Sequence, residues 1–235
     1  SIRPGIPVEW IWKLMRRFHG PADHTFAATL SLADELNSRG LERTHIWPRG
    51  VDLEQFNPDV PPHPAMAELP HPIMLNVGRV APEKNIEAFL ELGVEGSKVV
   101  VGGGPALDKM KAAYPDVLFL GPKHGAELAS VYTAADVFVF PSRTDTFGLV
   151  NIEALACGVP VAAYPVPGPA DILGPGECGL HGGSAPIGAL DEDLAAAIAR
   201  ALSADRYAAS VEARHYSWDR CTKLFFAGLA KSNRR

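Results

Sequence analysis

The stretch FPSRTDTFGLVNIEALACGVPV, residues 140–161, contains the features that decide the fold and the site. It begins at the end of an apolar run, continues through a polar loop, and then places apolar residues three and four positions apart over residues 149–156. This pattern predicts a buried strand, a loop and a helix that begins near Gly148. The first amides of such a helix have no partner within it and lie at the positive end of its dipole, so we expect an anion to bind there.

Two carboxylates flank the start of this helix. Asp145 precedes it and Glu153 lies inside it, eight positions later, so the two side chains can face opposite ends of one elongated ligand. The alternative for an isolated pair is that Asp145 caps the helix and Glu153 is a solvated helix position. The neighbouring motifs favour the ligand interpretation.

Short apolar runs recur on both sides of this stretch, as expected of strands that are buried on both faces of a parallel sheet. The expected strands are residues 73–77, 98–101, 117–120, 137–140 and 159–163. Helical spacing of the apolar residues between them predicts helices at residues 86–92, 107–114, 126–135 and 149–156. Right-handed connections then give an α/β fold with a doubly wound parallel sheet, whose ligands bind at the carboxyl ends of the strands.

The loops after the first two of these strands carry cations and glycines. In VGRVAPEKN, residues 77–85, Arg79 and Lys84 can reach a diphosphate and so replace a metal. The alternative is a solvated loop in which Glu83 and Lys84 are paired by chance. In VGGGPAL, residues 101–107, Leu107 takes the place of the last glycine of GxGxxG, so this segment alone predicts a tight turn with Pro105 at the first helical position.

The composition excludes several classes of protein. The 235 residues are 47% hydrophobic, enough for one large domain or two small ones, and the net charge of −5 lacks the basic excess that binding to nucleic acid requires. No apolar run approaches the ~18 residues of a membrane span, and SIRPGIPVEW lacks the apolar centre of a signal peptide, so we expect a cytoplasmic location. Three cysteines without a CxxC motif, and eight histidines without an HExxH motif or a clustered pair, predict no metal site.

Two regions flank the predicted sheet. Residues 57–72 contain six prolines, which favours an extended spacer and a domain boundary. Upstream, residues 25–28, 32–37 and 44–47 predict a strand, a helix and a strand, too little to bury a core alone. Downstream, residues 190–202, 204–215 and 219–231 predict amphipathic helices that close over the sheet. The expected organisation is residues 1–50 as the end of another domain, 51–72 as a linker and 73–235 as the main domain.

Together these segments resemble the C-terminal, donor-binding half of the retaining GT-B glycosyltransferases, most closely family 4, the group 1 glycosyl transferases. The resemblance is carried by GRVAPEKN (78–85), GGGP (102–105), FLGPKHGAELASVYTAADVFVFPS (119–142) and TDTFGLVNIEALACGVPV (144–161). It covers residues 44–231 in order and includes RGVDLEQFNP (49–58) and SWDR (217–220). Residues 1–50 would then be a remnant of the N-terminal GT-B domain.

The resemblance implies that a hexose is transferred from a nucleoside-diphosphate sugar to a lipid or saccharide acceptor, with retention of configuration and without a metal or cofactor. The implied catalytic residues are Asp145, which touches the transferred sugar, and Glu153, which holds the ribose hydroxyls. Arg79 and Lys84 would grip the diphosphate. Further implied donor contacts are Gly78 and Gly104, then Gly121, Pro122 and Lys123 beside the base, and Thr146, Phe147, Gly148, Leu149 and Val150 around the sugar and phosphate.

The sequence departs from the family pattern in two respects. The motif usually opens with glutamate, and Asp145 is one methylene shorter, which leaves the donor sugar open. A full member has an N-terminal domain of comparable size, with the acceptor site and a histidine near the reacting carbon. About fifty residues precede the linker here, the chain begins with Ser1 as a processed form or fragment would, and neither His19 nor His24 matches a motif.

Other functions are open at this point. The short N-terminal region suggests a catalytically inactive nucleotide-binding or regulatory module. A nicotinamide-dependent oxidoreductase is disfavoured, because no acidic residue ends a second strand about 20 residues after the glycines. The acidic triplet at residues 191–193 formally matches the DxD of metal-dependent transferases, but acidic residues at a helix start are ordinary dipole complements.

The segment WIWKLMRRF, residues 10–18, predicts an amphipathic helix. Ile11, Leu14 or Met15, and Phe18 fall on one face with basic residues elsewhere. This pattern suits peripheral association with an anionic membrane, here at its inner face. The alternative is that this face packs against the rest of an N-terminal domain.

Overall fold

The computed structural model describes residues 7–229, which form two compact units. Residues 50–218 make up the larger unit, and residues 7–49 together with residues 219–229 make up the smaller one. The site predicted from the sequence lies entirely within the larger unit. Every helix among the described residues is too short or too polar to cross a lipid bilayer.

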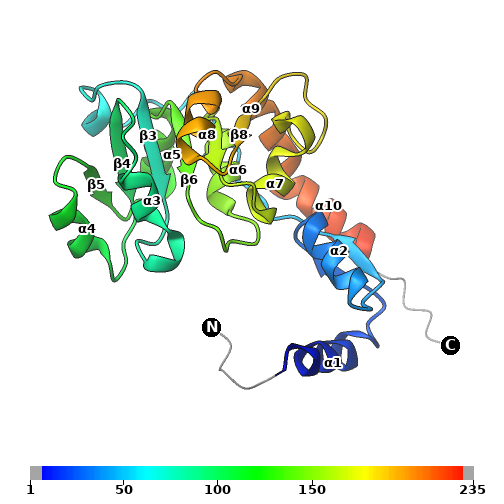
Figure 1. Cartoon of the computed structure of the whole chain (residues 1–235). Coiled ribbons are helices and arrows are strands. Elements are labelled where there is room, and N and C mark those ends of the chain that lie inside the picture. The colour runs from blue at the N-terminus through cyan, green and yellow to red at the C-terminus, as the bar shows by residue number, and fades with distance from the viewer. Residues whose placement is uncertain (1–6, 230–235) are drawn as a thin grey trace. The chain divides into compact units, whose positions relative to one another are not determined.

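A six-stranded parallel sheet forms the centre of the larger unit (Figure 1), which confirms the predicted fold class. Its order is β5-β4-β3-β6-β7-β8. The strands are β3 (Ile73–Val77), β4 (Ser97–Val101), β5 (Leu118–Gly121), β6 (Val137–Phe140), β7 (Val161–Ala163) and β8 (Gly188–Leu190). The central strands β3, β6 and β7 are buried along their whole length, which is why their sequences are apolar at consecutive positions.

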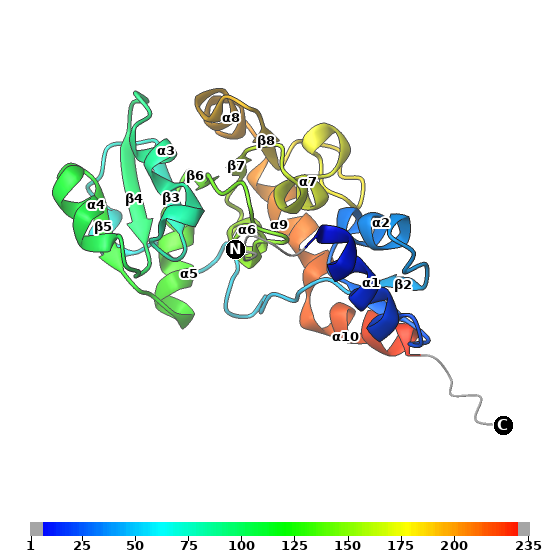
Figure 2. The same cartoon turned by 60° about the horizontal axis from the view of Figure 1, so that its bottom comes forward.

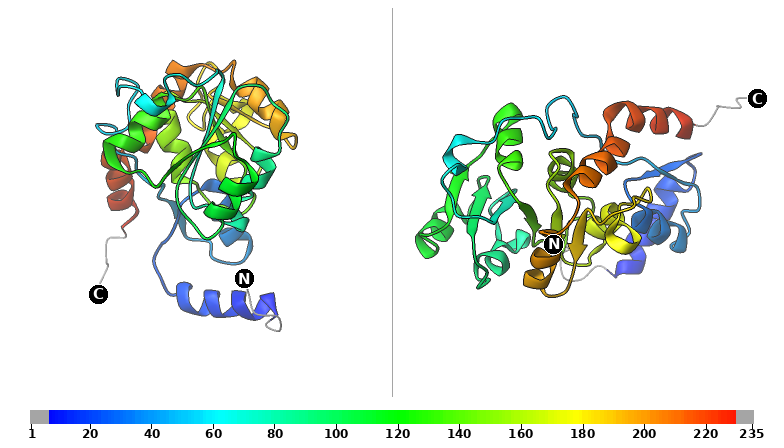
Figure 3. Two further views of the ribbon diagram at one scale, coloured as in Figure 1. Left: turned by 90° about the vertical axis from the view of Figure 1, so that its left-hand side faces the viewer. Right: turned by 90° about the horizontal axis from the view of Figure 1, so that it is seen from above.

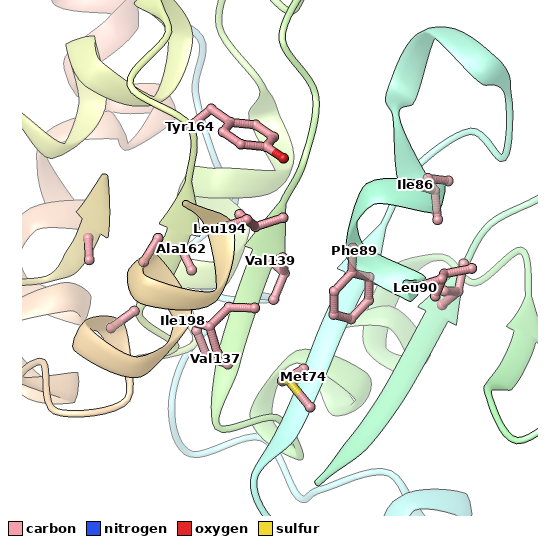
Figure 4. Packing of buried hydrophobic residues seen from close by; sticks show 14 of the residues in the cluster. Met74, Ile86, Phe89, Leu90, Val137, Val139, Ala162, Tyr164, Leu194 and Ile198 are labelled. Carbon is pink, nitrogen blue, oxygen red and sulfur yellow. The ribbon is translucent and has the colours of Figure 1, made fainter. Parts of the chain in front are cut away.

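Helices cover both faces of this sheet (Figure 2). The connections contain α3 (Ile86–Leu90), α4 (Leu107–Ala113), α5 (Gly125–Thr133), α6 (Leu149–Ala156) and α7 (Pro167–Leu173), and α8 (Leu194–Ala201) and α9 (Arg206–Ala213) follow β8. On one face, α3, α4 and α8 bury apolar side chains against the strands; Figure 4 shows Phe89, Leu90, Leu194 and Ile198 with Met74, Val139 and Ala162. On the other face, Tyr132 of α5 packs edge-on against Phe138 of β6.

The strand order reverses between β3 and β6, which makes the carboxyl ends of these two strands the switch point of the sheet. Their ladder pairs Met74 with Val137 and Leu75 with Phe138. Beyond it, the buried side chain of Asn76 donates from Nδ2 to the carbonyl of Val139 at 3.0 Å. The strands thus lose their backbone ladder towards the edge where ligands bind in sheets of this type.

The region after β7 differs from the prediction. The sequence did not predict α7 or β8, and the helix expected from residue 190 is wrong at its start, because Leu190 ends β8. The first turn of α7 contains Pro167 and Pro169, and β8 is only three residues long with a glycine in it, so neither shows a periodic pattern. Helix α8 begins at Leu194, and Asp193 caps it by accepting from the amide of Ala195 at 3.0 Å, which confirms the helix-start interpretation of the acidic triplet.

The proline-rich segment also differs from an extended spacer. Residues 57–72 lie within the larger unit, and the division between the units falls between residues 49 and 50. The segment includes the 3-10 helix η1 (Pro64–Met66), whose Met66 is 1% exposed. Burial of this side chain, together with Phe56 just upstream, holds the segment against its own unit.

The last helices do not all close over the sheet as expected. Helix α9 packs on α6, and α10 (Trp218–Gly228) belongs from Asp219 onward to the smaller unit. The predicted end of this helix at residues 230–231 lies outside the described residues.

The smaller unit contains α1 (Val8–His19), β1 (Thr25–Ala27), α2 (Leu30–Ser38), β2 (Thr44–Ile46) and most of α10. Strands β1 and β2 pair in parallel, and Phe225 of α10 contacts the rings of Phe26 and Trp47. Helix α1, dark blue in Figure 3, buries none of its residues fully and leaves Trp10 and Phe18 about three-quarters exposed, at 73% and 77%.

Candidate functional site

The loops that follow β3 and β6 meet at the switch point through an ion pair. Lys84 ends the 3-10 helix η2 (Pro82–Lys84) after β3, and Asp145 lies in the loop between β6 and α6. The ammonium Nζ of Lys84 lies 2.6 Å from Oδ1 and 2.8 Å from Oδ2 of Asp145. Both side chains are partly buried, with 30% and 23% of their surface exposed. The fold thus brings together two predicted site residues that are 61 positions apart.

A second contact joins the same two loops. Asn85 follows Lys84 and adopts the left-handed conformation, with φ of 54°, which asparagine tolerates better than most residues. Its Nδ2 donates to the carbonyl of Pro141 at 3.0 Å. The position of Lys84 relative to the end of β6 is therefore fixed by a hydrogen bond next to it.

Arg79 lies in the same loop as Lys84 but is placed differently. Its guanidinium Nη1 is 3.4 Å from Oε1 of Glu83, and 64% of its side chain is exposed. The structure therefore pairs Lys84, and not Arg79, with the carboxylate at the switch point. The predicted contact of Arg79 with a diphosphate stays a prediction.

The glycines bring the loops of neighbouring strands into direct backbone contact. The amide of Gly78 donates to Val101, and that of Gly102 donates to Gly121, both at 2.9 Å. A Cβ atom at Gly102 would lie 1.8 Å from the carbonyl oxygen of Gly78, at a φ of 138°. Only glycine fits such an approach, so this part of the predicted glycine motif holds the loops together.

Gly104 and Pro122 belong to the same set of contacts. A Cβ atom at Gly104 would lie 2.3 Å from the carbonyl oxygen of Val80, and one at Gly103 would lie 3.2 Å from Cγ of Pro122. The predicted donor contacts at the ends of β3, β4 and β5 therefore share one edge of the sheet. Lys123, at the same edge, forms an ion pair with Glu127 of α5.

Helix α6 begins at the switch point, as predicted. Gly148 is its N-cap residue with φ of 76° and ψ of 74°, a conformation that favours glycine. Thr146 and Leu149 are exposed and Val150 is half-buried, whereas Phe147 is buried with its ring 6.2 Å from that of Tyr216. The backbone around Gly148, rather than the Phe147 ring, is therefore what this loop offers to an anion.

The first turn of this helix contains a buried polar residue. Asn151 is 0% exposed, and neither polar atom of its side-chain amide has a hydrogen-bond partner among the described residues. A Cβ atom at Gly148 would lie 2.5 Å from Nδ2 of Asn151. An unsatisfied buried amide costs stability, and here it adds a dipole next to the free amides of α6.

Glu153 is held by a residue of the neighbouring helix. The hydroxyl of Tyr132 on α5 donates to Oε2 of Glu153 at 2.9 Å. Burial raises the pKa of the Glu153 carboxyl, and the hydrogen bond from Tyr132 opposes that shift. Burial, with Glu153 nearby, also raises the pKa of the Cys157 thiol to about 12, so this cysteine is not a thiolate nucleophile.

Sequence reasoning found the charged residues of the site but missed Asn85 and Tyr132, which position them. It also missed the buried Asn151. Each is a single polar residue within an otherwise ordinary strand-end or helix pattern. Only a partner far away in the sequence distinguishes Asn85 and Tyr132 from solvated positions. The asparagine at the end of VGRVAPEKN was the one available signal, because asparagine is common in the left-handed conformation.

Away from the switch point, folding brings together two histidines that the sequence leaves 34 positions apart. His181, Glu212 and His215 each offer a ligand atom, and among residues 7–229 these atoms could hold one metal ion. The sequence shows no clustered histidine pair, but the folded chain brings His181 and His215 together.

Comparison with known families identifies this arrangement. The family described as "Glycosyl transferases group 1" matches residues 66–218, which include the whole parallel sheet and its switch point. The chain belongs to the group 1 glycosyl transferases.

Several curated proteins are similar over most of the chain. A GDP-mannose-dependent alpha-mannosyltransferase of Mycobacterium tuberculosis is 35% identical over 214 residues, covering 87% of this chain and 55% of the relative. A D-inositol 3-phosphate glycosyltransferase of Xylanimonas cellulosilytica is 32% identical, covering 91% of this chain and 58% of the relative. The chain thus spans about half the length of the curated relatives it matches.

Solved structures agree with the family assignment at the level of the fold. Sucrose-phosphate synthase from Thermosynechococcus elongatus superposes with a TM-score of 0.72 at 26% identity, covering 94% of this chain and 63% of that one. The parallel sheet flanked by helices is that of the GT-B glycosyltransferases.

Proposed function

We propose that this chain is the donor-binding half of a retaining hexosyltransferase of family 4, which uses a nucleoside-diphosphate sugar and no metal. The observation that supports this proposal most strongly is that Lys84, Asp145 and the first turn of α6 all lie at the switch point of the sheet. A cation, a carboxylate and free helix amides are the groups that a diphosphate joined to a sugar requires.

The diphosphate leaving group explains the choice of residues. It gains negative charge as the bond to the sugar breaks, so an ammonium group and helix amides that tighten on this charge lower the barrier selectively. Lys84 and the amides near Gly148 supply both, which supports a transfer that requires no metal in the reaction. The side chain of Arg79, 64% exposed, reaches the same diphosphate from the loop before η2 in this proposal.

Asp145 has two states in this mechanism. In the structure, its carboxylate neutralises Lys84 at 2.6 Å. When the diphosphate binds, Lys84 turns to the phosphate oxygens and Asp145 becomes available to accept hydrogen bonds from hydroxyls of the transferred sugar. The ion pair therefore keeps both groups in place and is exchanged for contacts with the donor.

Glu153 binds the ribose in this proposal. Two vicinal hydroxyls can donate to one carboxylate, and the hydrogen bond from Tyr132 at 2.9 Å leaves the other carboxylate oxygen for them. Tyr132 acts as a positioning residue, because it fixes the direction of the carboxylate without touching the donor.

The names of the relatives suggest the first donor to test. Three of the matched curated proteins are named GDP-mannose-dependent alpha-mannosyltransferases, at 33–36% identity. We therefore take GDP-mannose as the first candidate donor, with a lipid or a saccharide as acceptor. In this proposal residues 1–50 are the remnant of an N-terminal domain that carries the acceptor site.

Helix α1 supports a peripheral contact with the inner face of a membrane. Trp10, Leu14 and Phe18 are all at least 65% exposed, and basic side chains lie between them in the sequence. Such a helix can lie in the interface of an anionic bilayer. Co-sedimentation with anionic and neutral vesicles tests this part of the proposal, which requires retention by the anionic vesicles.

Calorimetry tests the proposed function. The chain is titrated with guanosine, uridine and adenosine diphosphates, each in the presence of a chelator. We expect one of the three to bind with 1:1 stoichiometry, and its sugar ester to bind at the same site in competition. Failure of a folded sample to bind any of them, or binding only when magnesium is added, would refute the proposal.

A further inference from the structure

A second cluster of titratable side chains lies in the larger unit, outside the switch point. Its members are His181, in the loop after the 3-10 helix η3 (Pro175–Glu177), Glu212 near the end of α9, and His215 in the 3-10 helix η4 (Arg214–Tyr216). The imidazoles of His181 and His215 stack with their centroids 4.0 Å apart. Nδ1 of His181 lies 2.7 Å from Oε1 of Glu212.

The chain builds this cluster around a buried carboxylate. Glu212 is 4% exposed, although acidic side chains are rarely buried without a charged partner. The loop closes directly over it, because a Cβ atom at Gly179 would lie 2.6 Å from Cδ of Glu212, and the φ of Gly179 is 89°. The spacing from Glu212 to His215 places both residues on one side of a helical turn.

We propose that His181, Glu212 and His215 bind one Zn²⁺ ion. Two imidazole nitrogens and one carboxylate oxygen are a common set of zinc ligands, and a water molecule completes the tetrahedron. The ligand atoms of the three residues lie within 4.8 Å of one another. Zinc–ligand bonds of about 2.1 Å require ligand atoms roughly 3.4 Å apart. Because the lone pair of an imidazole nitrogen lies in the ring plane, one of the two stacked rings must turn out of the stack when the ion binds.

The same ligands disfavour the alkaline-earth ions. Mg²⁺ and Ca²⁺ prefer shells of oxygen ligands, and two imidazoles provide none. The site is therefore also unsuited to the magnesium that metal-dependent sugar transfer would require. It is separate from the proposed donor chemistry, which involves Lys84 and the start of α6.

Bound zinc would join the loop at residues 174–183 to helix α9. This loop contains five glycines, and Gly174, Gly176, Gly179 and Gly182 all have positive φ, so it has little regular structure of its own. Zinc would connect His181 with Glu212, which are 31 positions apart in the sequence. The ring of Tyr216 contacts both His181 and Phe147, so this link also borders the loop that leads into α6.

Titration with zinc tests the proposal. The 235-residue chain is stripped of metal with a chelator, dialysed, and titrated with ZnCl₂ and, separately, with MgCl₂. We expect one zinc per chain, bound at micromolar or lower concentration, and no saturable magnesium binding. We also expect zinc to raise the midpoint of thermal unfolding, because an ion that binds only the folded state stabilises it.

Variants assign the ligands. Substituting His181→Gln or His215→Gln removes one nitrogen ligand, and each should weaken zinc binding by more than the roughly 10–100-fold that loss of an outer-shell partner costs. Both variants should also lose the thermal shift. His45→Gln is the matched control, because His45 belongs to another close histidine pair. Its ring centroid lies 3.9 Å from that of His24 in the smaller unit. This variant should leave zinc affinity unchanged.

The wild-type titration stands even if a variant fails to fold, which circular dichroism reports. The proposal is overturned if the folded wild-type chain binds no zinc at micromolar concentrations. It is equally overturned if the folded His181→Gln and His215→Gln variants bind zinc as well as the wild type does. Loss of nucleotide binding has no bearing on either outcome, so the two proposals fail independently.

Discussion

At the scale of single residues, the ion pair between Lys84 and Asp145 holds opposite charges together at the switch point. The two side chains lie 2.6 Å apart and are only partly exposed, so the ion pair is partly shielded from water. A diphosphate competes with Asp145 for Lys84. Within this pair, only the substitution of Lys84 should therefore weaken diphosphate binding.

Removing the cation should weaken diphosphate binding specifically. A charge-assisted contact contributes about 1.5–3 kcal/mol, so we expect Lys84→Ala to weaken binding of the nucleoside diphosphate about ten- to hundredfold and binding of the nucleoside much less. Arg79→Ala should do the same. Asp145→Asn removes the competitor of the phosphate and should leave diphosphate affinity equal or higher. Calorimetry measures all three, with Lys109→Ala, an exposed lysine paired with Glu87, as the control.

Equal weakening of nucleoside and diphosphate binding by Lys84→Ala would show that this lysine does not face the phosphates. A large loss of diphosphate affinity in Asp145→Asn would show that the carboxylate acts by holding Lys84 in place.

Glu153 should make folding depend on pH. Its pKa is raised from 4.5 by burial, so the folded state holds the proton more tightly than the unfolded state does. The stability that this residue contributes is present below pH 4.5 and is lost as the pH rises through its folded pKa. Glutamine at this position cannot ionise and can still accept the hydrogen bond from Tyr132. We therefore expect the stability of Glu153→Gln relative to wild type to increase with pH.

Urea unfolding from pH 4 to neutral pH measures this difference. A stability difference that is flat, or that falls as the pH rises, would contradict the raised pKa. In calorimetry the same variant should weaken binding of nucleoside and diphosphate alike, because Glu153 is proposed to face the ribose.

The sequence was sufficient to predict the charged residues of the site, but not their partners. Asp145 and Glu153 flank a helix start, a local pattern, whereas the partner of Asp145 is 61 positions away and that of Glu153 is 21 positions away. Tyr132 looks like any buried aromatic residue of a helix until its hydroxyl is placed. Local patterns predict where a carboxylate lies along an element, and tertiary contacts decide what it touches.

At the scale of elements, the loops at the carboxyl ends of β3, β4 and β5 are held together by backbone contacts that only glycine allows. Gly102→Ala would place a Cβ atom 1.8 Å from the carbonyl oxygen of Gly78 at a φ of 138°. We expect this substitution to lower the free energy of unfolding by at least about 2 kcal/mol, because both strain and overlap act against it.

Gly93→Ala is the matched control for this prediction. Its Cβ atom would meet nothing within 4 Å, and its φ is not positive, so we expect no loss of stability and a gain of up to about 1 kcal/mol. Urea unfolding compares the two variants. Equal stability of both would show that the loops move apart at little cost.

Most strands of the sheet could be predicted, because strands buried on both faces are apolar at consecutive positions. Most helices between them could be predicted from the helical spacing of their apolar residues. Helix α7 and strand β8 could not be predicted, since prolines open the helix and a glycine lies within a strand of three residues. The packing of α10 with the smaller unit was also beyond sequence patterns. An amphipathic helix shows that it has an apolar face, but not which element covers that face.

At the scale of the whole molecule, the chain spans about half the length of the curated relatives it matches. The proposed donor site lies within the matched residues. Transfer requires an acceptor positioned against the donor and shielded from water, which in a GT-B enzyme needs the cleft between two domains. We therefore expect the 235-residue chain to bind donor but to transfer sugar at a negligible rate, with slow hydrolysis of the donor at most.

Release of nucleoside diphosphate from sugar nucleotides, GDP-mannose first, measures this activity with and without saccharide and lipid acceptors. The comparison is a chain that carries a complete N-terminal domain. Acceptor-dependent turnover by the short chain at the rate of the longer one would place the acceptor site within these residues. The anomeric configuration of the longer chain's product, read by NMR, tests retention.

The most direct test of the central claim is a crystal structure of the chain with its nucleoside diphosphate, grown in the presence of a chelator. The proposal predicts phosphate oxygens within hydrogen-bond distance of the Lys84 ammonium and of the amides at the start of α6, with Asp145 released from Lys84 and the ribose hydroxyls on Glu153. A diphosphate bound away from the carboxyl ends of β3 and β6, with the Lys84–Asp145 pair still intact, would contradict it.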